Sequence, residues 1–158
     1  MKNRSLAHRL AWWFALLVAI VPALAADGPD ASLDAVAAVR AQLEALAAND
    51  EPTPGAGIAR TWDFASPANR RATGPLARFR TLFESPAYEP MLDHVAARIS
   101  DARQQGDAAL VGVVLRAPSG VEYGYLFQLS RQGLAECDGC WLTDSVVPIP
   151  VPPAAPTI

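Results

Sequence analysis

The feature that most constrains the fold is a repeat of apolar side chains at every second position in the segment VEYGYLFQLS, residues 121–130. Every odd-numbered position in it is apolar: Val121, Tyr123, Tyr125, Phe127 and Leu129. Since successive side chains of a strand point to opposite faces of a sheet, this period of two predicts a strand with one face on a core. The rest of the chain must therefore supply something to cover that face.

Three further segments are predicted to be strands, joined to the first and to each other by short turns. They are HVAARIS at 94–100, AALVGVVLR at 108–116, and a segment from Leu134 to about Val146. QQGD, APSG and RQG are the predicted turns between them. Strands joined by connections this short pair antiparallel, so the C-terminal half is predicted to form a meander.

The N-terminal half has helical periodicity instead. Residues 30–50 carry an apolar stripe at Val36, Val39, Leu43 and Leu46, and Asp30 or Ser32 is the expected N-cap. Pro52 and Pro54 end this helix. Ser66-Pro67 and Gly74-Pro75 predict two short helices, near 67–72 and 75–84. Helices first and strands afterwards indicate an α+β fold, with one longer and two short helices packed on a curved antiparallel sheet.

The two ends of the chain differ from this middle. Residues 1–25 have a basic start, an uncharged apolar run and small residues at Ala23 and Ala25, which is typical of a cleaved secretory signal peptide. The uncharged run ends at Ala26, short of the ~20 residues that a membrane-spanning helix prefers; an uncleaved anchor is the alternative. Residues 148–158 are proline-rich and are predicted to be a disordered tail. Residues 31–147 then form a single domain.

This organisation predicts a periplasmic or secreted protein with no transmembrane segment after cleavage. Beyond Ala25 the chain keeps 10 arginines and no lysine against all 16 acidic residues, a net charge of about −6. That balance argues against nucleic acid as a partner.

Several segments resemble a known group of sequences. They are RAQLEALAAND at 40–50, FASPANRRATGPLARF at 64–79, YEP at 88–90, YLFQLSRQG at 125–133 and DGCWL at 138–142. Together they cover roughly residues 33–147. Through them the chain resembles an uncharacterised family of small bacterial domains within the nuclear-transport-factor-2-like (cystatin-like) fold group.

The resemblance implies a cone-shaped α+β fold and no assigned activity. Domains of this group often pair through the open sheet face, so it also implies a homodimer. Two positions depart from the family pattern. Leu134 stands where a tryptophan is usual, and Cys137 stands where an aliphatic residue is usual.

Cys137 and Cys140 are the only two cysteines. A redox-active pair needs a helix N-terminus, and WLTDSVVPIP follows instead, which is predicted to be strand and tail. Structural zinc needs four ligands, and the chain beyond Ala25 adds only one histidine, His94. A disulfide across a turn or bulge at Gly139 is the preferred interpretation, with two buried free thiols as the alternative. No metal and no cofactor are expected.

Acid–base chemistry inside a cone needs a desolvated carboxylate or histidine and a donor for the developing oxyanion. Asp63, flanked by Trp62 and Phe64, and His94, at the start of a predicted strand, are weak catalytic candidates. We expect Asp63 at the surface and His94 exposed or bonded at the sheet edge. No acid and base are brought together by spacing alone.

Ligand binding is the better-supported hypothesis. Aromatic side chains expected to line an apolar pocket are Phe64, Tyr88, Tyr123 and Tyr125. Arg70, Arg71, Arg78 and Arg80 concentrate positive charge and form either an anion site or a solvated helix face.

Three functions therefore stay open. The first is a non-catalytic domain that binds a small molecule or an envelope protein. The others are an isomerase- or hydratase-type enzyme and an envelope-associated assembly module that acts through its tail.

Overall fold

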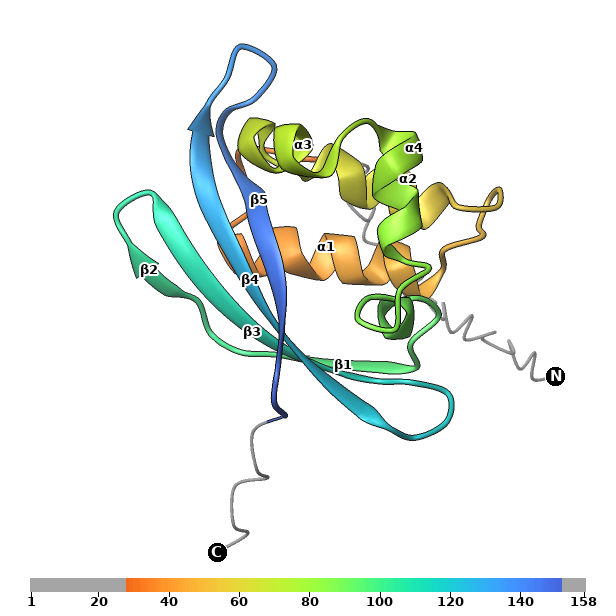
Figure 1. Ribbon diagram of the computed structural model, residues 1–158. Helices are drawn as coiled ribbons and strands as arrows, with labels where there is room; N and C mark the ends of the chain where they lie inside the picture. The colour runs from red at the N-terminus through yellow and green to blue at the C-terminus, as the bar shows by residue number, and fades with distance from the viewer. Residues whose placement is uncertain (1–27, 152–158) are drawn as a thin grey trace, which may run out of the picture.

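The computed structural model describes residues 28–151, so the predicted signal peptide and most of the proline-rich tail lie outside the described residues (Figure 1). The helices are α1 (Ala35–Ala47), α2 (Ala56–Asp63), α3 (Pro67–Thr73) and α4 (Leu76–Leu82), followed by the 3-10 turn η1 (Glu89–Met91). The strands are β1 (Ala96–Ile99), β2 (Arg103–Gln105), β3 (Ala108–Arg116), β4 (Glu122–Gly133) and β5 (Asp138–Ile149). Within residues 28–151 no helix has both the length and the apolar character needed to cross a membrane.

The strands form one antiparallel sheet in the order β1-β3-β4-β5, with β2 pairing β3 beside β1. Figure 1 shows the helices gathered inside the curve of this sheet. The predicted α+β class is confirmed. The predicted turn at 104–107 is partly wrong, because Gln105 pairs with Ala108 and makes β2 the first arm of a tight hairpin.

The alternation in VEYGYLFQLS places its apolar face on the core as predicted. Tyr125, Phe127 and Leu129 are at most 2% exposed and pack with Val39, Leu43 and Leu46 of α1. Val121 is the exception at 50% exposed, since β4 begins only at Glu122. β5 continues through Pro148 to Ile149, where Pro148 pairs with Tyr125, so strand structure extends into the first residues of the predicted tail.

The cap of α1 was predicted wrongly. Asp34 is the N-cap, and its carboxylate accepts from the Ala37 amide at 2.7 Å. Asp30 instead accepts from the Ser32 amide at 2.8 Å and forms a local turn before the helix. The Ser66-Pro67 start of α3 is confirmed, because Ser66 Oγ accepts from the Asn69 amide at 3.2 Å.

Helix α2 was missed altogether, because its eight residues follow a proline-rich stretch and include a glycine. The structure shows what holds it. Ile58 N donates to Asn49 Oδ1 at 3.0 Å and Gly57 N donates to the Asn49 main-chain oxygen at 2.9 Å. Asn49, two residues after the end of α1, therefore supplies acceptors for two of the first amides of α2, which have no partner within their own helix.

Candidate functional site

A cleft opens where the short helices α3 and α4 meet the middle of β5, and we call it the β5 cleft. Its cavity volume is about 230 Å³. The apolar residues lining it are Leu46, Ala65, Ala72, Phe79, Leu82, Phe83, Met91, Phe127 and Val146. The other lining residues are Gln42, Thr61, Asn69, Thr73, Tyr88, Thr143, Asp144 and Ser145.

Aromatic side chains make up much of the apolar wall. Phe79 and Phe83 pack edge to face with ring centroids 5.6 Å apart, and both are more than 90% buried. Tyr88 closes one side, where its hydroxyl donates to the Val146 main-chain oxygen at 3.0 Å. These contacts fix the wall before any ligand enters.

A group of buried polar side chains lies on the α1–β5 side of the cleft. Gln42 is 1% exposed and Thr143 is 2% exposed. Thr143 Oγ1 donates to Gln42 Oε1 at 3.1 Å, and Gln42 Nε2 donates to the Ala38 main-chain oxygen at 3.0 Å. Thr61 Oγ1 donates to the Gly57 main-chain oxygen at 2.9 Å. Each of these polar side chains is bonded within the protein, as buried polar groups generally are.

The backbone around Thr143 is also unusual. β5 carries a register shift here, since Leu129 pairs with Thr143 while the adjacent Gln128 pairs with Ser145, leaving Asp144 as an extra residue. Main-chain bonds from residues 64–66 cover the strand edge: Thr143 N donates to Phe64 O at 2.7 Å and Ser66 N donates to Thr143 O at 2.9 Å. The bulge and this short bridge bring the α2–α3 connection against the sheet beside the cleft.

Of the seven residues predicted to bind a ligand, only Tyr88 lines the β5 cleft. Phe64 is fully buried in the core, and Tyr123 packs on the core while half-buried. Tyr125 is 1% exposed, its hydroxyl donates to the Ala87 main-chain oxygen at 3.0 Å, and burial raises its pKa to about 12. These three rings therefore belong to the core or pack on it, and they do not line the cleft.

The arginines do not converge on the cleft either. Arg70 donates to the main-chain oxygens of Ala65, Trp62 and Asp63 at 3.0, 3.2 and 2.9 Å. Its guanidinium also stacks 4.0 Å from the centre of the Trp62 ring. It therefore satisfies carbonyls at the end of α2, while Arg71 and Arg78 are exposed.

The two catalytic candidates lie apart from each other. Asp63 is exposed at the last residue of α2, as expected. His94 is buried, with Nδ1 2.9 Å from the Met91 main-chain oxygen, and it lines a different cavity with Arg40 and Glu44 of α1. In residues 28–151 no group of three or more histidine, cysteine, aspartate or glutamate side chains is placed to hold a metal.

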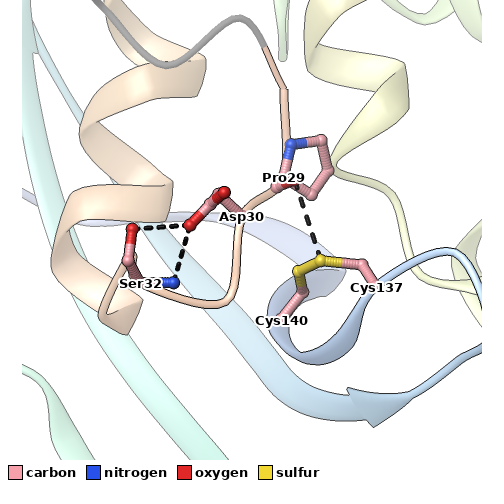
Figure 2. Close-up of a disulfide and its surroundings, with 5 residues drawn as sticks. All are labelled: Pro29, Asp30, Ser32, Cys137 and Cys140. Atoms are coloured by element: carbon pink, nitrogen blue, oxygen red, sulfur yellow. Dashed lines mark hydrogen bonds between the residues drawn. A yellow bond between two sulfur atoms is a disulfide. The ribbon is translucent and has the colours of Figure 1, made fainter.

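The cysteine pair lies at disulfide distance, with the two Cα atoms 5.6 Å apart. Gly139 between them has φ of +88° and lies in a register shift of the β4–β5 pairing, which is the bulge that the bond requires. Figure 2 shows the pair beside the start of the described chain, where Cys137 Sγ lies 3.7 Å from the Pro29 main-chain oxygen. The disulfide therefore packs against the segment that leads into α1.

Sequence reasoning missed Gln42, Thr61 and Thr143. One signal was available for the first of them. Gln42 shares the apolar face of α1 with Val39, Leu43 and Leu46, so the sequence pattern already indicated that its polar amide would be buried. Thr61 and Thr143 gave no such signal, because a threonine is ordinary in a strand or a short polar helix.

Comparison with known proteins finds one family. The family model described as Domain of unknown function (DUF4864) matches residues 29–154, which includes every helix and strand of the structure. No curated protein and no solved structure matches the chain.

Proposed function

The chain belongs to the DUF4864 family of domains of unknown function, and we propose that it is an exported, non-catalytic domain that binds a small, mostly apolar molecule in the β5 cleft. The observation that carries the proposal is the composition of the cleft wall. Aromatic and aliphatic side chains form most of it, and a few bonded polar groups occupy one side. Ligand sites generally have this composition, with apolar walls and few polar groups that orient the ligand.

The size of the cleft supports a small ligand. A cavity of about 230 Å³ lies just below the range of roughly 300–1,000 Å³ that is usual for drug-sized ligands. A compact molecule of two or three rings fits this space better than a long acyl chain. The wall is also fixed by its own contacts, such as the Tyr88–Val146 hydrogen bond, so binding requires little ordering of the protein.

The arrangement of ionisable groups supports binding over catalysis. Neither Asp63 nor His94 lines the cleft, and the only ionisable carboxylate side chain among its lining residues is that of Asp144. General acid–base catalysis needs a proton-transfer group within hydrogen-bond reach of the substrate, usually with a partner. An isomerase or hydratase role would need Asp144 to work without a histidine beside it.

Export and fold group belong to the same proposal. We infer export from the predicted signal peptide at 1–25, and the Cys137–Cys140 pair at disulfide distance supports it, because disulfides persist in oxidising compartments. We also place the domain in the nuclear-transport-factor-2-like (cystatin-like) fold group, on the basis of helices packed inside a curved antiparallel sheet. An envelope partner, a homodimer and a role for the tail remain predictions.

The test is binding of the uncharged fluorescent probe N-phenyl-1-naphthylamine to the purified protein. Ala72 is exposed and lines the cleft, and Ala68 is exposed on the same helix but does not line it. We expect Ala72→Trp to weaken probe binding at least about 10-fold by filling the opening, with Ala68→Trp unchanged. Native mass spectrometry of protein taken from its own periplasm would reveal a carried ligand. Absence of probe binding, or equal loss in both variants, refutes the proposal.

A further inference from the structure

We propose that the β5 cleft selects uncharged ligands whose polar group is a carbonyl oxygen, and that Gln42 donates the hydrogen bond that recognises it. This inference rests on the proposed function, because it names the class of ligand for that same cleft. It follows from an account of which hydrogen-bonding groups of the cleft wall are already used.

The orientation of the Gln42 amide is fixed by its partners. The main-chain oxygen of Ala38 can only accept a hydrogen bond, so the atom 3.0 Å from it must be the amide nitrogen. The amide oxygen then faces Thr143, whose hydroxyl donates to it at 3.1 Å. This leaves the side chain with one N–H that has no partner among the described residues.

The hydroxyl protons on this side of the cleft are already committed. Thr143 donates to Gln42 and Thr61 donates to the Gly57 main-chain oxygen at 2.9 Å. Asn69, like Gln42, has an amide nitrogen with only one of its two N–H groups bonded. Its Nδ2 donates to the Thr143 main-chain oxygen at 3.0 Å, and its second N–H has no partner among the described residues. The polar side of the cleft therefore offers donors to a ligand, and both come from amides bonded to Thr143.

Beside Gln42, whose amide oxygen is already occupied by Thr143, a ligand group that accepts and does not need to donate is the best match. A carbonyl oxygen fits that requirement, whereas a hydroxyl group must also place its own proton. Leaving the buried Gln42 N–H unpaired under a purely apolar ligand is unfavourable, which gives the carbonyl its advantage.

The charge of the lining excludes the strongest acceptors. The lining residues include no lysine, arginine or histidine, and their one carboxylate residue, Asp144, is itself acidic. Moving a carboxylate or phosphate group from water into an apolar cleft has a desolvation cost, and without a cation in the cleft no ion pair offsets that cost. Anionic ligands are therefore disfavoured even though they accept hydrogen bonds well.

Three probes of nearly the same shape separate these alternatives: 2-acetylnaphthalene, 2-isopropylnaphthalene and 2-naphthoate. Each is measured by displacement of N-phenyl-1-naphthylamine at pH 7. We expect the ketone to bind about 10-fold more tightly than the isopropyl compound, as one added hydrogen bond allows, and the anion to bind at least about 10-fold more weakly than the ketone.

Gln42→Met keeps the length of the side chain and removes the donor. It should lower the affinity for 2-acetylnaphthalene about 10-fold and leave that for 2-isopropylnaphthalene unchanged. Gln104→Met is the matched control, since Gln104 is exposed on β2, donates to the Gly106 main-chain oxygen at 3.1 Å and does not line the cleft. If Gln42→Met fails to fold, the infrared carbonyl band of 13C-labelled ketone bound to the unaltered protein still tests the hydrogen bond, because it must lie below its position in an apolar solvent.

The outcomes are distinct. Equal displacement by the ketone and the isopropyl compound, or tightest binding of the anion, overturns the carbonyl inference and leaves the proposed function standing. An unshifted carbonyl band also overturns it. Failure of the dye and all three probes to bind overturns the proposed function and this inference together.

Discussion

The contact between α1 and α2 provides a sharp test of how the site is built, through the change Gly57→Ala. A methyl group at residue 57 would lie 2.0 Å from the Ala45 main-chain oxygen and 2.8 Å from the Asn49 Cα atom. Both are backbone atoms, one in α1 and one two residues beyond its end, so neither can swing away as a side chain could. Relief requires α2 to move away from α1 and the residues just after it by more than 1 Å, because ordinary contacts of this kind begin near 3.4 Å.

Two opposite effects decide the sign of the stability change. Alanine is a better helix former than glycine by about 1 kcal/mol, which favours the variant. Overpacking of this kind costs about 1–3 kcal/mol. Shifting α2 also stretches the hydrogen bonds that the Gly57 and Ile58 main-chain amides donate to Asn49, each worth about 1 kcal/mol. The net expectation is a loss of about 2–4 kcal/mol in the free energy of unfolding.

Urea denaturation followed by circular dichroism measures this loss as a lower transition midpoint. The control is Ala59→Gly in the same helix, which introduces no clash and should cost only about 1 kcal/mol through helix propensity. Probe binding should fall as well in Gly57→Ala, since the same contact places Thr61 beside Gln42 in the cleft wall. A variant as stable as the original protein, or more stable, refutes the close approach of the two helices.

Three further predictions follow from individual groups. Burial raises the pKa of Tyr125 to about 12, above its unfolded value near 10. The neutral phenol therefore contributes to stability fully below pH 10, and this contribution is lost between pH 10 and 12. Thermal melts at alkaline pH should show the free energy of unfolding falling by up to about 2 kcal/mol, a fall that Tyr125→Phe lacks. Reducing Cys137–Cys140 should cost about 2 kcal/mol before any strain is considered, from the entropy of a loop this short, and dithiothreitol should not affect a variant with serine at both positions. Hydrogen bonds from two arginines, Arg98 first, lower the pKa of Glu122 to about 2, so carboxyl NMR titration of Arg98→Gln should show that pKa rising toward its ordinary value.

Most of the fold could be predicted from the polarity pattern of the strands. The alternation around Tyr125 identified β4 and its buried face, because a half-buried strand must repeat every two residues. The Ser66-Pro67 pair identified the start of α3 for an equally local reason, since its side chain and ring act on the next turn alone.

What sequence could not supply depends on contacts between distant segments. α2 begins after Gly55 with no side-chain cap of its own and relies on Asn49 in the connection that follows α1. β2 has three fully exposed residues, so no apolar pattern marks it; pairing with β3 alone makes it a strand. Neither segment has a local sequence pattern that predicts its structure: α2 contains a glycine, and β2 is polar throughout.

The candidate site shows the same division. Of the four aromatic residues predicted to line a pocket, Tyr88 lines the cleft, whereas Phe64 and Tyr125 are buried in the core and Tyr123 packs on it. Which ring lines a cavity depends on how far each covering helix extends, and that length is set by capping and by tertiary contacts. The Gln42–Thr143 pair joins residues 101 positions apart, so no window of the sequence contains it.

The position of the cleft follows from a mismatch in length between the two layers. β5 has 12 residues and spans about 40 Å, whereas α3 and α4 have seven residues each and cover about 10 Å apiece. Gly74, with φ of +83°, and Pro75 end the first of these helices and begin the second, so they do not merge into one longer covering element. The strip of β4 and β5 left between them contributes the apolar Phe127 and Val146 and the polar Thr143, Asp144 and Ser145 to the cleft wall. We expect that lengthening α3 across Gly74 would close the cleft, so the proposed ligand binding depends on that break in the helical layer.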